Sequence, residues 1–180
     1  MTTLNEKHER GTTLNEKLER GTRYDMVEFL HDVRAEDLCI YSKILLEQLG
    51  KEKAIGLVKK ARWDARYEMG RKTAEDLGHP KDMETFVEAY DKRLDSIFYI
   101  PPVENRLIAK NKAIMKFSMC FLGEAILRRK PDKDLLDVLK AYCNHDEGWA
   151  GGWNPDMKCE KIKYILDGDD SCDFLFEVEE

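Results

Sequence analysis

Apolar positions in the first half of the chain recur every three or four residues, which is the spacing of amphipathic helices. One helix is predicted from Tyr24 to a stop at Gly50, and a second is predicted to close at Gly78. A third is predicted to begin after Asp82, whose side chain can cap it. The positions that step in this way are Val27, Leu30, Arg34, Leu38, Tyr41, Leu45 and Leu49, then Ala54, Val58, Ala61, Ala65 and Met69, then Met83, Phe86, Val87, Tyr90 and Leu94.

The second half begins with a change of pattern at Pro101-Pro102, which stops helix propagation. Residues 103–110 and 113–119 are predicted to pair as a hairpin around Asn111, because Asn tolerates the positive φ of a tight turn. A second hairpin is predicted from residues 157–166 and 171–178, where apolar and polar positions alternate.

Two helices are predicted between these hairpins, a short one through Leu122 and Ile126 and a longer one from Asp132 to about Asp146. The sequence therefore predicts an α+β fold, with N-terminal helices followed by an antiparallel sheet of about four strands and helices packed on one side.

A direct repeat opens the chain: residues 2–11 read TTLNEKHERG, and residues 12–21 repeat them with one change. One ten-residue duplication is too short to build a repeat architecture. We therefore expect residues 1–22 to form a flexible, duplicated tail and residues 23–180 to form a single domain.

Charge and hydropathy indicate which classes of partner the protein does not bind. The chain of 180 residues has a net charge of -6, which argues against nucleic acid as the main partner. No stretch is apolar enough for a secretion signal or a membrane span, so we expect a soluble, cytoplasmic protein that does not bind membranes. A homo-oligomer is compatible with the sequence, and five cysteines, an odd number, fit reduced thiols better than a disulfide framework.

Candidate chemistry concentrates between Tyr142 and Phe176. Cys143 and Asp146 lie on one face of the longer predicted helix, while Cys120 follows a strand and Cys172 begins another. These three ends of elements could converge on one cavity, where a thiol would act as a nucleophile and the carboxylate as a base. Burial of each cysteine in the core is the alternative reading.

Zinc is a second reading of the same residues, because Cys120, Cys143, His145, Asp146 and Cys172 offer soft ligands. No compact metal motif such as C-x-x-C is present, so we expect no cofactor and keep zinc as the alternative.

Substrate contacts are expected from His145, from Asn154 at its Asn-Pro corner, and from Trp149 and Trp153 in a glycine-rich loop. Aromatic faces on a mobile loop could cover a small ring, and two aromatic plugs that pin the loop to the core are the alternative.

The order of Cys120, Y-C-x-x-D (residues 142–146), N-P (residues 154–155) and G-D-D-S-C-D-F-x-F (residues 168–176) resembles the L-2-amino-thiazoline-4-carboxylic acid hydrolase family. The W-D-x-R-Y-x-x-G stretch at residues 63–70 fits the layout of that family. The chain departs from the pattern in having Phe121 where a proline is expected, and in having Lys161 and Lys163 where an arginine is often found.

This resemblance implies an enzyme that hydrolyses a C-N bond in a small cyclic amidine or related heterocycle, with a small-molecule substrate. On that model Cys120, Cys143, Asp146, Asn154 and Cys172 carry over as pocket residues. The alternative function is a non-catalytic sensor domain that binds a small ligand or a metal, since a fold does not fix a function.

Overall fold

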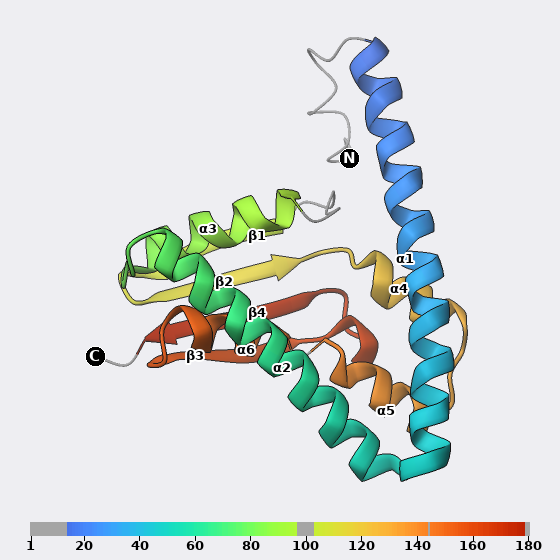
Figure 1. Ribbon diagram of the computed structural model, residues 1–180. Coiled ribbons are helices and arrows are strands. Elements are labelled where there is room, and N and C mark those ends of the chain that lie inside the picture. The colour runs from blue at the N-terminus through green and yellow to red at the C-terminus, as the bar shows by residue number, and fades with distance from the viewer. Residues whose placement is uncertain (1–13, 97–102, 144, 179–180) are drawn as a thin grey trace.

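A computed structural model describes residues 14–96, 103–143 and 145–178. Its N-terminal half is three helices, α1 (Leu14–Leu49), α2 (Lys51–Asp76) and α3 (Met83–Ser96), as Figure 1 shows. Gly50 separates the first two at a positive φ of 75°, a conformation that glycine adopts without a Cβ clash. The predicted break at this glycine is therefore confirmed.

Helix α1 begins earlier than the hydrophobic pattern predicts, at Leu14 inside the second copy of the repeat. The backbone of residues 14–22 thus continues into the long helix, while residues 1–13 lie outside the described part of the chain. The start of α3 agrees with the prediction, because the Asp82 carboxylate accepts a hydrogen bond from the Thr85 amide at 2.8 Å.

The described residues form one antiparallel sheet of four strands, ordered β1-β2-β4-β3. Strands β1 (Val103–Ala109) and β2 (Lys112–Phe117) make the first predicted hairpin. Strand β4 (Cys172–Val178) pairs with both β2 and β3 (Met157–Lys163), so it lies inside the sheet. The predicted change of pattern at Pro101-Pro102 lies outside the described residues.

Helices cover one face of this sheet, which confirms the predicted α+β layout (Figure 1). The core between them is aromatic: Phe86 of α3 lies 5.0 Å from Phe176 of β4 and 5.1 Å from Trp149, measured between ring centroids. Alternate residues of β4 are buried, as the period of two predicts for a sheet with one covered face.

The segment between the hairpins differs from the prediction. It forms α4 (Phe121–Arg128), α5 (Lys133–Ala141) and α6 (His145–Trp153), so the long predicted helix ends at Ala141 and the expected glycine-rich loop is helical. Its glycines let α6 lie directly on α2: a Cβ at Gly152 would come within 2.0 Å of the Tyr67 carbonyl oxygen, and one at Gly70 within 2.1 Å of the Trp149 carbonyl oxygen. Helix packing thus overrides the low helix propensity of glycine here.

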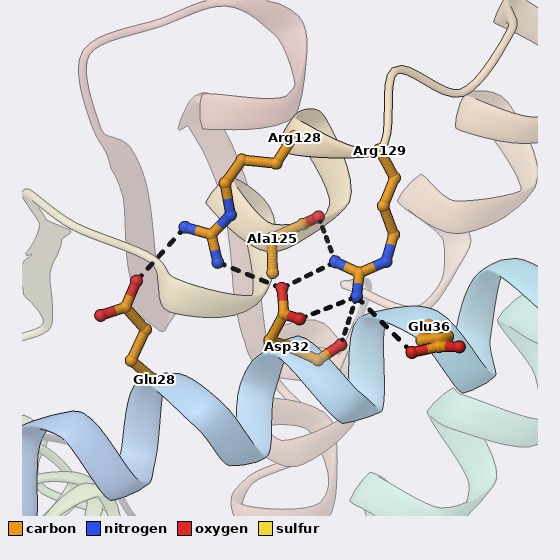
Figure 2. A network of polar contacts seen from close by, with 6 residues as sticks. All are labelled: Glu28, Asp32, Glu36, Ala125, Arg128 and Arg129. Carbon is orange, nitrogen blue, oxygen red and sulfur yellow. Dashed lines mark hydrogen bonds and ion pairs between the residues drawn. The ribbon is translucent and has the colours of Figure 1, made fainter.

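A network of ion pairs fixes α4 against α1 (Figure 2). The Arg129 guanidinium donates to both carboxylate oxygens of Asp32, at 2.8 and 3.0 Å, and to the Asp32 carbonyl oxygen at 2.9 Å. Arg128 reaches Asp32 at 3.2 Å and Glu28 at 3.4 Å. We call this set, with Glu36, the α1–α4 clasp.

No helix in the described part of the chain combines the length and the apolar composition that crossing a membrane requires.

Candidate functional site

One cavity of about 140 Å³ lies where the sheet end meets helices α1, α2, α3 and α6. Its wall is mostly apolar and includes Phe117, Leu122, Ile165, Leu166 and Phe174. The polar and ionisable side chains that reach it are His31, Arg34, Arg62, Arg66, Tyr90, Cys120, Tyr142, Cys143, Asp146, Tyr164 and Cys172. A small apolar cavity with a few convergent charged groups is typical of a binding site for a small molecule.

The topology brings three cysteines to this cavity. Cys120 follows the end of β2 and caps α4, and its sulfur accepts a hydrogen bond from the Gly123 amide at 3.2 Å. Cys172 begins β4 directly opposite Phe117 of β2, and its sulfur accepts from the Ile165 amide at 3.4 Å. Cys143 follows α5. These three thiols and Asp146 therefore line one cavity, and their catalytic role stays a prediction.

Burial governs the protonation of these thiols. It raises the pKa of Cys120 to about 12 and the pKa of Cys172 to about 11, and backbone amide donors offset only part of the effect. Burial also raises the pKa of Cys143, against a hydrogen bond from Tyr164 that lowers it. Near neutral pH these groups are thiols, so a thiolate nucleophile is not favoured.

Asp146 is the buried carboxylate of the site, only 3% exposed in the first turn of α6. The Tyr90 hydroxyl donates a hydrogen bond to one of its oxygens. Burial, together with this neighbouring carboxylate, raises the pKa of Tyr90 well above its ordinary value, so Tyr90 remains a donor. The pair fixes the orientation of Asp146 at the cavity wall.

Two arginines of α2, Arg62 and Arg66, line the same cavity as Asp146. The Nε of Arg62 donates to the Tyr142 carbonyl at 3.3 Å, and Arg66 lies one turn further along the helix. Burial lowers the pKa of both, repulsion from neighbouring arginines adds to this, and Asp146 partly offsets it. No described carboxylate forms an ion pair with either guanidinium within 4.0 Å, so both can accept an anion from outside the chain.

Helix α1 adds His31 and Arg34 to the wall. Burial, and then the positive charge of Arg34, lower the pKa of His31, so the imidazole is neutral near pH 7. Its Nδ1 atom is buried without a hydrogen-bond partner among the described residues, and its ring stacks on Phe121 at 6.1 Å between centroids. A neutral imidazole in this position can accept a proton.

Three of the four predicted substrate contacts do not line this cavity. Trp149 and Trp153 do not line the cavity; they are buried in the core, where they stack on each other and contact the Phe86 ring at tilted and edge-on angles. The Asn154 side chain accepts the Asp156 amide at 3.0 Å, which closes the turn after α6. These residues hold α6 in place, because the expected loop is a helix packed on both sides. His145 begins α6, and its side chain lies outside the described part.

The arginines and His31 are the site residues that sequence reasoning missed. Arg66 stands inside the W-D-x-R-Y-x-x-G stretch, where an arginine two residues after an aspartate was available as a signal. Among the described residues, no three His, Cys, Asp or Glu side chains gather as a metal site. The zinc reading also needs His145, whose side chain is not described.

Comparisons with known proteins agree with the order of motifs. The family model described as L-2-amino-thiazoline-4-carboxylic acid hydrolase matches residues 31–176, which begins at His31 and ends at Phe176. A comparison with curated proteins gives no match. A solved structure, trafficking protein particle complex subunit 3 from Naegleria fowleri covalently bound to palmitic acid, is similar at a TM-score of 0.49 and 15% identity, over 82% of this chain and 96% of that one.

Proposed function

The chain belongs to the L-2-amino-thiazoline-4-carboxylic acid hydrolase family, and from this premise we propose that its cavity hydrolyses a small cyclic amidine that carries a carboxylate. The observation that carries the proposal is the presence of opposite charges around one cavity, Asp146 on α6 and the guanidinium groups of Arg62 and Arg66 on α2, which form no ion pair with a described residue. An aminothiazoline carboxylate has the complementary charges at its two ends. Buried, oriented charges of this kind discriminate strongly because unpaired partners are costly.

Binding follows from this complementarity. The substrate carboxylate pairs with Arg62 and Arg66, whose depressed pKa values reflect burial without an ion-pair partner among the described residues. The protonated amidine points at Asp146, held by the Tyr90 hydroxyl. The apolar wall from Phe117 and Phe174 packs against the ring.

The reaction adds water to the amidine carbon. Its oxygen bonds to that carbon, and the tetrahedral adduct collapses to a carbonyl as a ring bond breaks. For an aminothiazoline that gives an N-carbamoyl cysteine, the ring C-N bond survives and the C-S bond breaks. One water proton ends on the ring nitrogen and the other on the released sulfur. For this substrate, therefore, the bond that breaks is the ring C-S bond and not the C-N bond that the resemblance led us to expect.

Two groups can move these protons. His31 lines the cavity with a neutral imidazole, and it takes a proton from the attacking water. Asp146 stabilises the cationic amidine as charge shifts. The raised pKa values of Cys120 and Cys172 make these thiols donors to the departing sulfur rather than nucleophiles.

The first prediction tests this charge recognition. Purified protein is incubated with 2-amino-thiazoline-4-carboxylate or with 2-aminothiazoline, which lacks the carboxylate, and ring-opened product is measured by mass spectrometry. We expect the wild type to prefer the carboxylate, and Arg66→Gln to reduce kcat/KM for it by about 10- to 100-fold, mainly through KM. The variant should change turnover of 2-aminothiazoline little, because no carboxylate is present to lose its partner.

Arg106→Gln, at an exposed arginine of β1, is the matched control and should leave both rates unchanged. Asp146→Asn should abolish turnover of both compounds. Equal loss on both compounds in Arg66→Gln, or a fully active Asp146→Asn, would contradict these assignments.

A non-catalytic sensor is the second candidate, favoured by the protonated state of all three cavity thiols. Calorimetry with the same carboxylate separates the two functions. Saturable binding without product, abolished in Arg66→Gln, would support the sensor and exclude the hydrolase.

A further inference from the structure

The outward face of α1 carries an apolar stripe that the reaction does not use. Large apolar residues recur there every three or four positions, and Phe29 is 66% exposed, Tyr41 59% and Met26 53%. The full set, which we call the α1 stripe, is Met26, Phe29, Leu30, Val33, Ile40, Tyr41 and Ile44. Contiguous exposed apolar surface on this scale is typical of an interaction site.

The opposite face of the same helix already packs on the body of the protein. Val27, Ala35 and Ser42 are fully or almost fully buried, and α1 contacts α4 and α5 along this side. In Figure 1 the helix runs along one edge of the molecule. Helix α1 is therefore apolar on two faces, and only one of them is covered within the chain.

The charges beside the stripe argue against a membrane as its partner. Glu28, Asp32 and Glu36 flank it and are turned toward Arg128 and Arg129 in the α1–α4 clasp (Figure 2). A border in which arginines are paired with acids offers no excess of free cations, and amphipathic surface helices need such an excess to bind anionic lipids. The first 13 residues are also a poor cover, because Met1 and Leu4 are their only large apolar side chains.

Two charges along the stripe select an orientation for a second copy. Asp37 lies within it, and the exposed Arg34, which also reaches the cavity, lies at its border; neither forms an ion pair with a described residue. In an antiparallel pairing centred near Ala35, Arg34 falls within about one helical rise, 1.5 Å, of the position opposite Asp37 of the other copy. A parallel pairing instead places Asp37 against Asp37, which repels.

The same register aligns the apolar residues. Met26 falls opposite Ile44, and Leu30 opposite Ile40, in both halves of the pair. A two-fold axis makes such an interface self-complementary, so each contact occurs twice. We propose that the α1 stripe is a homodimer interface in which two copies of α1 pack antiparallel. This proposal does not depend on the reaction in the cavity.

The experiment measures mass in solution by sedimentation equilibrium at roughly 1 to 100 µM protein. We expect the wild type at twice the chain mass of 21.0 kDa. The double variant Val33→Glu with Ile40→Glu should run as a monomer with unchanged circular dichroism. Leu57→Glu, at an apolar residue of α2 that is 52% exposed outside the stripe, should remain a dimer. Asp37→Arg should raise the dissociation constant about tenfold or more, because it sets like charges opposite Arg34.

Disulfide trapping tests the orientation. The double variant Met26→Cys with Ile44→Cys should form an intermolecular disulfide on oxidation, while neither single variant does. Cross-linking of the single variants would indicate a parallel pair and overturn the proposal. A wild type that stays at 21.0 kDa at the highest concentration, a dimer unaffected by the glutamates, or binding of the stripe to anionic vesicles would also overturn it.

Discussion

The cavity separates residues by how burial acts on their charge. A thiol responds by keeping its proton, and so the pKa of Cys120 rises to about 12. Arg62 and Arg66 bear a charge that burial makes costly, so burial lowers their pKa values, but both guanidinium groups stay protonated near neutral pH. The same apolar wall therefore keeps the cysteines protonated and poorly nucleophilic, and it favours binding of an anion by the arginines.

The rate of alkylation measures how reactive the buried thiols are. At pH 7.5 we expect iodoacetamide to modify Cys172 about 100-fold and Cys120 about 1,000-fold more slowly in the folded protein than in urea, because the reactive thiolate is rare when the pKa is about 11 or about 12. Peptide mass mapping over time measures each rate. A rapid reaction of Cys120 at neutral pH would instead identify an activated nucleophile.

Sequence reasoning predicted four of the eleven described polar and ionisable side chains that reach the cavity. Cys120, Cys143, Asp146 and Cys172 stand at ends of elements, where chemistry-bearing residues are easy to suspect. His31 and Arg62 sit inside long helices among many exposed charges, and nothing in their local pattern distinguishes them. Only the packing of α2 on α6 shows which arginines face inward.

At the scale of elements, the contact between α2 and α6 sets the distance between the arginines and Asp146. Three glycines allow the two helix backbones to come this close: Gly70 on α2, and Gly148 and Gly152 on α6. A Cβ at Gly148 would come within 2.7 Å of the Trp63 carbonyl oxygen. The atoms that a Cβ would meet here belong to the backbone, which cannot move aside as the end of a flexible side chain can. Replacing any of these glycines with alanine would therefore shift a whole helix.

Gly152→Ala should therefore destabilise the protein by about 2 kcal/mol, the usual cost of overpacking. Gly56→Ala, in the same helix pair but with nothing within 4 Å of its Cβ, should stabilise it by about 1 kcal/mol through helix propensity. Urea unfolding of both variants measures the difference. Equal shifts in the free energy of unfolding would mean that α6 can move away from α2 at little cost.

The glycines also explain why α6 could not be predicted. Gly148, Gly151 and Gly152 within nine residues read as a loop when propensity alone is considered. The helix exists because its tryptophans bury against Phe86 and its glycines admit α2. Both are tertiary effects, while the helices around Gly50 and Asp82 follow from local signals and were predicted.

At the scale of the whole molecule, the α1–α4 clasp joins the long helix to the sheet end that bears Cys120. Hydrogen bonds from Arg129 and Arg128 lower the pKa of Asp32 from 3.8 to about 2. A carboxylate with a depressed pKa in the folded state stabilises the protein above its ordinary pKa, and this contribution is lost as pH falls through about 2. The network is exposed, so salt screens it.

Thermal unfolding should show this window. We expect the wild type to melt above Asp32→Asn at pH 6, with a difference that narrows below pH 4, vanishes near pH 2 and shrinks in 0.5 M NaCl. Asp76→Asn removes an exposed carboxylate outside the clasp and should show no such dependence. A difference that stays constant down to pH 2 would assign the effect to packing.

The order of strands β1-β2-β4-β3 has a consequence for the growing chain on the ribosome. Strand β3 is synthesised before β4, yet β4 is its hydrogen-bonding neighbour in the sheet. The inner edge of β2 also pairs with β4. A nascent chain that has emerged only as far as β3 therefore presents two open strand edges, which are templates for aggregation. Chaperone demand should peak in that interval and fall once β4 inserts between its neighbours.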